Sequence, residues 1–233
     1  NGHTPHCLEA YRKLSAGADE PYYPVSDPAL MPVGHKQCEA TGLALAKFLK
    51  EEDVGVGRAV VSPMTRTCQS ALGVLKELKE QGIDVPHVVL DPDIRERSRG
   101  CKSDTGTPRS RLLTKNATAK QLLEEWQADA SLIQEEIWWR EHEEDTDVDA
   151  RIKAFRERYK EEIADPHKVM IVFSHAGVIR RDLSMPCHPD NMQAILVTLD
   201  KEPVTLANPA KADDFHEIHI PKGIEDLLPP EAA

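Results

Sequence analysis

Short runs of β-branched and other apolar residues alternate along this chain with stretches whose apolar residues recur every three or four positions. The runs predict strands, and the stretches predict amphipathic helices. The predicted strands span residues 58–61, 88–90, 169–173, 194–199 and 216–220. Strands that alternate with helices are typical of α/β folds, because parallel strands need long crossover connections. We therefore predict an α/β fold with a mostly parallel central sheet flanked by helices.

Four groups of apolar residues at helical spacing define the predicted helices. Their members are Cys38, Leu45, Phe48 and Leu49; Ala71, Leu72, Leu75 and Leu78; Leu122, Leu123, Trp126, Ile133 and Ile137; and Ile152, Phe155, Tyr159 and Ile163. The second helix is predicted to end near Gly82, because glycine takes the left-handed conformation that closes a helix. Apolar residues show no regular spacing over residues 98–118, which predicts a long loop. The acidic stretch 141–149 is predicted to be a solvated connector.

Residues 98–165 are predicted to form an insertion, a loop followed by a helical cap, within a single domain that spans residues 1–233. The three tryptophans of the chain lie in this insertion. They either stack on a substrate ring or pack in the core, and aromatic residues at helical spacing usually bury area, which favours packing. The tail 221–233 is predicted to fray.

Composition narrows the classes of partner. The chain has 233 residues, of which 30% are charged, and a formal net charge of −11. Nucleic acid and anionic lipid would be repelled at long range, so neither is an expected partner. The apolar run 169–173 is far shorter than the ~20 residues that span a bilayer. No membrane partner is expected, and the sequence carries no signal for an oligomeric state.

The five cysteines are scattered and never form a Cys-x-x-Cys pair. This usage predicts neither a disulfide framework nor a zinc site, and it favours a reducing compartment. A cytoplasmic location is the default expectation, with an organelle-targeting segment upstream of Asn1 left open.

Two of the predicted strands end in polar residues that can carry chemistry. The run 169–173 leads into Ser174-His175-Ala176-Gly177, and the run 58–61 leads into Ser62-Pro63 and a helix that carries Arg66. Because open α/β sheets place their chemistry at the carboxyl ends of strands, we expect Arg66 and His175 to meet there. The arginine fork can donate two hydrogen bonds to a phosphate. The alternatives are a surface salt bridge for Arg66 and a packed core histidine at position 175.

The ordered motifs resemble those of the histidine phosphatase superfamily, also called the phosphoglycerate-mutase-like family. They are Ser62-Pro63-Met64-Thr65-Arg66-Thr67-Cys68-Gln69-Ser70-Ala71, Ile94-Arg95-Glu96-Arg97 and Ser174-His175-Ala176-Gly177-Val178, and the run 27–37 resembles the segment that leads into the family's first helix. The resemblance covers roughly residues 2–181. Within the family, residues 93–106 look closest to a fungal, algal and plant branch. The resemblance implies a three-layer sandwich fold.

In that family a first histidine attacks phosphorus, a carboxylic acid protonates the departing oxygen, and a second histidine with arginines stabilises the phosphoryl oxygens. No metal or other cofactor is required. The resemblance implies that His175, Glu96 and Arg66 are catalytic, and that Arg66, His175 and Ala176 contact the substrate. The alternative for Glu96 is pairing with Arg95, Arg97 or Arg99 on a solvated face, which would lower its pKa and impair it as an acid.

The amino terminus departs from the family pattern. The family begins with a strand that leads into Arg-His-Gly, whose histidine is phosphorylated, whereas this chain opens with Asn1-Gly2-His3-Thr4-Pro5-His6-Cys7. In one register Asn1 occupies the nucleophile position, and the protein is a phosphate-binding pseudoenzyme, because an amide cannot form the phosphoenzyme. In the other register the nucleophile lies just upstream of Asn1. We favour the second, because a central parallel strand is hard to dispense with.

Asn1, His3 and His6 are expected to line the phosphate pocket, with solvated loop residues as the alternative for the two histidines. A zinc site from His3 and His6 lacks a third ligand, so no metal is predicted.

The resemblance implies a metal-independent phosphomonoesterase that acts through a phosphohistidine on a small phosphorylated metabolite. The alternatives are an inactive phosphate-binding or protein-interaction module and a phosphoglycerate-type mutase. Hydrolysis is preferred over mutase action because the segments around the site look unlike those of glycolytic mutases, which is an argument by analogy. Arg180 and Arg181 either reach a second substrate phosphate or lie on the surface.

Overall fold

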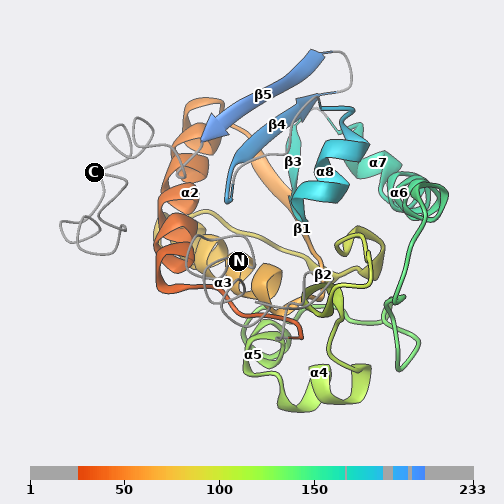
Figure 1. Cartoon of the computed structure of the whole chain (residues 1–233). Helices are drawn as coiled ribbons and strands as arrows, with labels where there is room; N and C mark the ends of the chain where they lie inside the picture. Colours follow the sequence, from red (N-terminus) through yellow and green to blue (C-terminus); the bar gives the residue numbers. More distant parts are fainter. Residues whose placement is uncertain (1–25, 166, 186–190, 199–200, 208–233) are drawn as a thin grey trace, which may run out of the picture.

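The computed structural model describes residues 26–165, 167–185, 191–198 and 201–207 (Figure 1). Its centre is a three-stranded parallel sheet with the order β2-β1-β3. The strands are β1 (Gly55–Val61), β2 (Val88–Leu90) and β3 (Lys168–Phe173). The predicted α/β fold with a parallel central sheet and flanking helices is confirmed.

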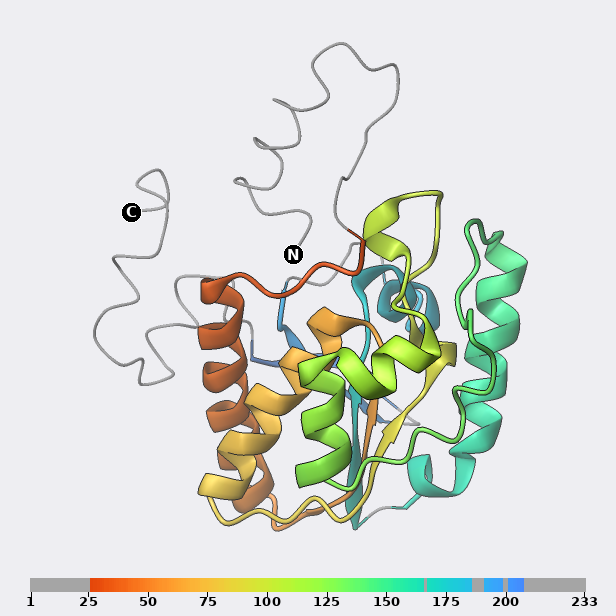
Figure 2. The ribbon, with the colours of Figure 1, turned by 90° about the horizontal axis from the view of Figure 1, so that it is seen from below.

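Helices cover the two faces of the sheet as separate layers (Figures 1 and 2). On one face lie α2 (Pro32–Glu51), α3 (Thr65–Glu80) and α5 (Ala117–Glu125), and on the other lie α6 (Asp145–Arg158) and α7 (Lys160–Ile163). Successive side chains of a strand point to opposite faces. This alternation buries apolar side chains of β1 on both sides of the sheet.

One irregularity sets the alignment of β1 with β3. Val56 pairs with Val169, but Arg58 pairs with Met170, so Gly57 is an extra residue in β1. Such a bulge inserts one residue into one strand of a pair. Beyond it the two strands run in register, residue for residue, until Val61 pairs with Phe173.

Helix α3 forms because it buries one continuous apolar stripe. Ala71, Val74, Leu75 and Leu78 are all buried in the main core. The helix ends at Glu80, and Gly82 has a φ of +76°, which confirms the predicted left-handed closure.

The prediction of a long loop over 98–118 is wrong. This segment contains a 3-10 turn, η2 (Lys102–Asp104), the helix α4 (Arg109–Lys115) and the start of α5. Asn116 caps α5, because its side-chain oxygen accepts hydrogen bonds from the N–H groups of Thr118 at 3.1 Å and Ala119 at 3.0 Å. A cap residue of this kind can start a helix where the sequence before it shows no regular spacing of apolar residues, which is why the spacing did not reveal this helix.

The helix predicted to run from Leu122 to Ile137 is also shorter than expected. It ends at Glu125, and Gln127 has a φ of +50° that turns the chain away. The following loop buries Ile133 and leaves Ile137 half exposed. Trp138 in this loop is buried, and its indole N–H donates to the carbonyl of Thr107 at 2.8 Å. Packing rather than an open stacking surface is therefore the role of Trp138.

The acidic stretch 141–149 is more than the predicted connector. Helix α6 begins inside it, at Asp145, and Glu143 is 1% exposed. The helix predicted over 152–163 is interrupted at Tyr159, which separates α6 from α7. The connector interpretation is wrong at Glu143, which is buried against Arg95 and Arg151, whereas Glu141, Glu144, Asp145 and Asp149 are exposed as expected.

After β3 come the helix α8 (Ala176–Asp182) and an antiparallel pair of strands, β4 (Ala194–Thr198) and β5 (Lys201–Ala207). The sequence predicted β4 but not β5. The predicted strand 216–220 and the tail 221–233 lie outside the described residues. In the part of the chain that is described, no helix is both long enough and apolar enough to cross a membrane.

Candidate active site

The carboxyl ends of β1 and β3 adjoin, and both lead directly into polar residues. Ser62 follows Val61, and its backbone N–H donates to the carbonyl of Phe173 at 3.0 Å. The hydroxyl of Ser62 lies 2.9 Å from Nε2 of His175. The strand register thus fixes the imidazole above the sheet.

His175 is buried, with 6% of its surface exposed. Burial is the main reason that its pKa lies well below the ordinary value, and the positive charges of Arg66 and Arg151 lower it further. The imidazole is therefore neutral at neutral pH. If Ser62 donates to Nε2, the ring proton is on Nδ1; if Nε2 carries the proton, Ser62 accepts it. In either arrangement the ring keeps one N–H group.

Ser62 was not among the predicted site residues. Its own motif is visible in the sequence, but the contact with a residue far along the chain follows only from the strand register. Ser62 is fully buried, so it orients the imidazole and has no access to a substrate.

Arg66 stands in the first turn of α3, with 13% of its side chain exposed. Its Nη1 donates to the carbonyl of Ser103 at 2.9 Å, and its Nη2 lies 3.7 Å from Oδ1 of Asp104. The turn η2 therefore holds the guanidinium group in place, near enough to His175 for its charge to lower the pKa of the imidazole.

Asp27 anchors the start of α3 and so the position of Arg66. Its carboxylate accepts hydrogen bonds at 2.7 Å from the N–H and the hydroxyl of Thr65 and from the hydroxyl of Thr107. The side-chain amide of Asn116 donates to the same Thr65 hydroxyl at 2.8 Å. The carboxylate replaces the side-chain cap that Met64 does not provide.

Glu96 lies against the first turn of α8. A Cβ atom added to Gly177 would come within 2.6 Å of Oε1 of Glu96, so a larger residue at this position would displace the carboxylate. The same oxygen accepts a hydrogen bond from the N–H of Arg97 at 2.9 Å. The Glu96 carboxyl group therefore lies beside Gly177, two residues after His175.

Two of the three arginines proposed as partners of Glu96 pair with other carboxylates. Arg95 forms an ion pair with Glu143, and Arg97 forms one with Asp145. These contacts do not support the alternative in which Glu96 pairs with Arg95 or Arg97.

Asp104 is a second carboxyl group at the site that the sequence did not predict. Burial raises its pKa to about 6, the negative charge of Glu96 adds to the shift, and Arg66 opposes it. Asp104 is held in η2, which the sequence assigned to a long loop. Its proximity to Glu96 and Arg66 therefore had no local signal.

The remaining predicted site residues fall into two groups. Ala176 directly follows His175 as the first residue of α8, whereas Asn1, His3 and His6 lie outside the described residues. Among the described residues, no three His, Cys, Asp or Glu side chains gather as a metal site.

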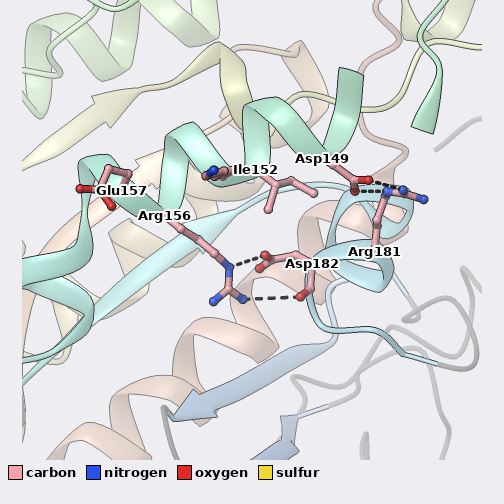
Figure 3. A pocket seen from close by; sticks show the side chains of 7 residues that line it. Asp149, Ile152, Arg156, Glu157, Arg181 and Asp182 are labelled. Atoms are coloured by element: carbon pink, nitrogen blue, oxygen red, sulfur yellow. Dashed lines mark hydrogen bonds and ion pairs between the residues drawn. The ribbon is translucent and has the colours of Figure 1, made fainter. Parts of the chain in front are cut away.

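The seam between α6 and α8 contains a hollow of about 380 Å³ (Figure 3). Two ion pairs cross it, Arg156 with Asp182 at 2.6 Å and Arg181 with Asp149. Arg181 is therefore bound to a carboxylate of α6. His175, Arg66 and Glu96 do not line this hollow, so it is separate from the site above the strand ends.

Comparison with known proteins gives a family match and, among solved structures, matches of low similarity. No curated protein matches this chain in sequence. A solved structure, the ecdysone phosphate phosphatase of Bombix mori in complex with tungstate, is 13% identical with a TM-score of 0.39. The similarity covers 67% of this chain and 55% of that one, so this chain spans about half the length of the phosphatase. A similarity this low carries no inference about activity.

The family match covers more of the chain. Residues 16–197 match the model of the histidine phosphatase superfamily, branch 1. This range includes the ends of β1 and β3 with Ser62, Arg66, Glu96 and His175. The chain belongs to the histidine phosphatase superfamily.

Proposed function

We propose that this chain is a phosphatase that hydrolyses a phosphate monoester of a small metabolite through a phosphohistidine, without a metal or other cofactor. The observation that carries the proposal is the convergence of Arg66, His175 and Glu96 above the adjoining strand ends. Membership of the superfamily supports a phosphatase-type function.

The reaction has two steps. In the first, a histidine nitrogen attacks phosphorus, the N–P bond forms as the ester P–O bond breaks, and Glu96 donates a proton to the departing oxygen. In the second, water attacks phosphorus, the Glu96 carboxylate takes its proton, and phosphate leaves with the histidine restored. The attacking histidine in this proposal lies outside the described residues.

Arg66 and His175 stabilise the phosphoryl group as its charge is redistributed. The guanidinium group offers paired N–H donors and a fixed positive charge. With Ser62 donating to Nε2 and the ring proton on Nδ1, the neutral imidazole offers one N–H donor from a buried position, where electrostatic interactions are stronger than in water. Both groups are held in place before the substrate binds, which lowers the cost of reaching the transition state.

Hydrolysis of a singly phosphorylated substrate agrees better with the site than mutase action. A mutase must hold a second anionic group, and Arg181, one of the two basic residues proposed for that task, is paired with Asp149 and Asp145. The net charge of −11 also disfavours polyanionic substrates.

We also propose a cytoplasmic, reducing location. Cys38 and Cys68 are free and buried in the core, and burial raises the pKa of both thiols. Unpaired, unreactive cysteines support a reducing compartment.

The proposal is tested by assaying the protein with its complete native amino terminus for phosphate release from p-nitrophenyl phosphate, beside the variants Arg66→Ala and His175→Ala. Each variant is expected to lose about 10²–10³-fold in kcat/KM, the usual cost of one transition-state donor. Arg111→Ala, which removes an exposed arginine of α4, is the matched control and should keep full activity.

Three other results would each count against the proposal. Phosphate binding without turnover would identify an inactive phosphate-binding module. Transfer of phosphate between hydroxyl groups with little release would identify a mutase. Turnover that survives in His175→Ala would remove His175 from the reaction.

A further inference from the structure

Glu143 is a buried carboxylate that the proposed reaction does not use. It is 1% exposed and lies just before α6. Arg95 binds its Oε1, and Arg151 contacts Oε1 through Nε and Oε2 through Nη2, both at 3.2 Å. Burying three charges together costs desolvation energy that their attraction only partly offsets. Such a cluster points to a role beyond stability.

The contacts of Glu143 converge on the segment that carries Glu96. Its Oε2 accepts from the N–H of Ser98 at 3.2 Å, and its own N–H donates to the carbonyl of Ser98 at 2.9 Å. Its carbonyl accepts from Nε of Arg97 at 3.2 Å. On the other side of Glu96, Arg95 binds the Glu143 carboxylate directly.

Arg151 adds a contact at the beginning of the segment that carries Glu96, residues 93–98. Its Nη1 donates to the carbonyl of Asp93 at 2.6 Å while its other nitrogens bind Glu143. The hydroxyl of Ser174 donates to the carbonyl of Ile94 at 2.9 Å, which joins the same segment to the His175 loop. The backbone is therefore fixed before and after Glu96.

We infer that Glu143 is a positioning residue that sets the Glu96 carboxyl group against Gly177 and so against the departing oxygen of the substrate. The inference rests on the proposed function, in which Glu96 is the acid. Glu143 acts through backbone and arginine contacts and does not touch the substrate.

The inference is tested by measuring how the loss of kcat/KM in a variant depends on the leaving group of the substrate. An acid matters most when the departing oxygen is a poor leaving group, as in glycerol 2-phosphate, and least for p-nitrophenyl phosphate. Glu143→Asp keeps the charge but shortens the side chain, so it cannot reach all of its partners. We expect Glu143→Asp to lose about 10-fold more kcat/KM on glycerol 2-phosphate than on p-nitrophenyl phosphate.

Two comparisons give the result its meaning. Glu96→Gln should show the same selective loss to a greater extent. Ile133→Val, a core substitution on the opposite face of the sheet, should lower activity on both substrates equally or not at all. Equal losses in Glu143→Asp, beside a selective loss in Glu96→Gln, would overturn the inference alone. No selectivity in Glu96→Gln would overturn the acid role of Glu96, and with it the inference.

A second variant covers the case in which Glu143→Asp does not fold. Arg151→Lys keeps the positive charge but cannot bind Glu143 and Asp93 together. It should show the same selectivity, and amide hydrogen exchange at residues 95–98 should speed up relative to residues 88–90. Unchanged exchange at 95–98 in a folded Arg151→Lys variant would contradict the inference, whatever the activity of the chain.

Discussion

Helices α2, α3 and α5 cover one face of the sheet, here called the apolar face, with one large apolar core. Helix α6 covers the other, here called the charged face, with small apolar clusters and a buried group of charged side chains. The first face belongs to one large core cluster. The second has only small apolar clusters, and Glu143, Arg151 and Arg95 are buried beside them. Apolar contacts are non-directional, but ion pairs and hydrogen bonds fix both distance and angle.

The two faces of the sheet support different residues of the site. The apolar face supports α3, whose first turn presents Arg66. The charged face holds the segment of Glu96, where a shift of the carboxyl group would separate it from the departing oxygen. A rigid polar network is suited to the second task, provided that every charge in it keeps a partner.

The largest expected effect comes from breaking the charged face. Glu143→Ala leaves Arg95 and Arg151 buried without their carboxylate, and we expect the free energy of unfolding to fall by about 3–5 kcal/mol. Urea unfolding measures it, and Glu51→Ala, an exposed residue of α2, is the control. A loss below about 1 kcal/mol, the range of a surface pair, would remove the distinction between the two faces.

A second expected effect separates two groups at the site by pH. The pKa of His175 is lowered in the folded chain. When the pH decreases below 6.5, the ordinary pKa of histidine, the unfolded chain binds the proton more tightly, so the free energy of unfolding decreases as the pH decreases. Asp104 acts in the opposite direction, because its raised pKa of about 6 makes the folded chain the tighter proton binder. Asp104→Asn removes that compensation.

In Asp104→Asn we therefore expect the free energy of unfolding to drop by about 2 kcal/mol between about pH 7 and about pH 5. Urea unfolding at the two pH values measures the drop. The double variant with His175→Gln should lose the dependence, and a drop that persists there would assign it to other groups.

A smaller effect is expected at the anchor of α3. Asp27→Ala removes the carboxylate that caps this helix and binds Thr107, and such caps contribute about 1–2 kcal/mol. Thermal and urea unfolding measure the loss against Asp84→Ala, an exposed control. Equal stability of the two variants would show that the cap is replaced by water.

The smallest expected effect is a coupling energy. Val74→Ala on the apolar face and Arg151→Lys on the charged face have no partner in common, so their effects on stability should add within about 0.5 kcal/mol. A double-mutant cycle measures the deviation. A larger coupling would mean that the two faces act as one unit.

The elements of the apolar face could be predicted from the sequence. Strands β1, β2 and β3 and helices α2 and α3 carry regular apolar patterns, and Gly82 closes α3 as predicted. The motifs that end β1 and β3 also indicated which residues to examine, because chemistry at strand ends needs only the local sequence and the parallel topology.

The charged face could not be predicted in the same way. Arg95 and Glu143 are separated by 48 positions, and nothing in the local sequence of either indicates the other. The stretch around Glu143 looked solvated because acidic residues usually are. Asp104 and Ser62 were missed for the same reason, since their roles depend on contacts between distant segments.

The bulge at Gly57 has a consequence for the lengths of chain that this fold tolerates. Arg58–Val61 and Met170–Phe173 are matched residue for residue, so the number of residues between the bulge and Ser62 is fixed by the partner strand. Removing one residue there would displace Ser62 along the strand by about 3.3 Å and turn its side chain to the opposite face. Insertions and deletions are therefore tolerable at the amino-terminal ends of these strands, in front of the bulge. They are not tolerable in residues 58–62 or 170–175, where they would separate Ser62 from the histidine that it orients.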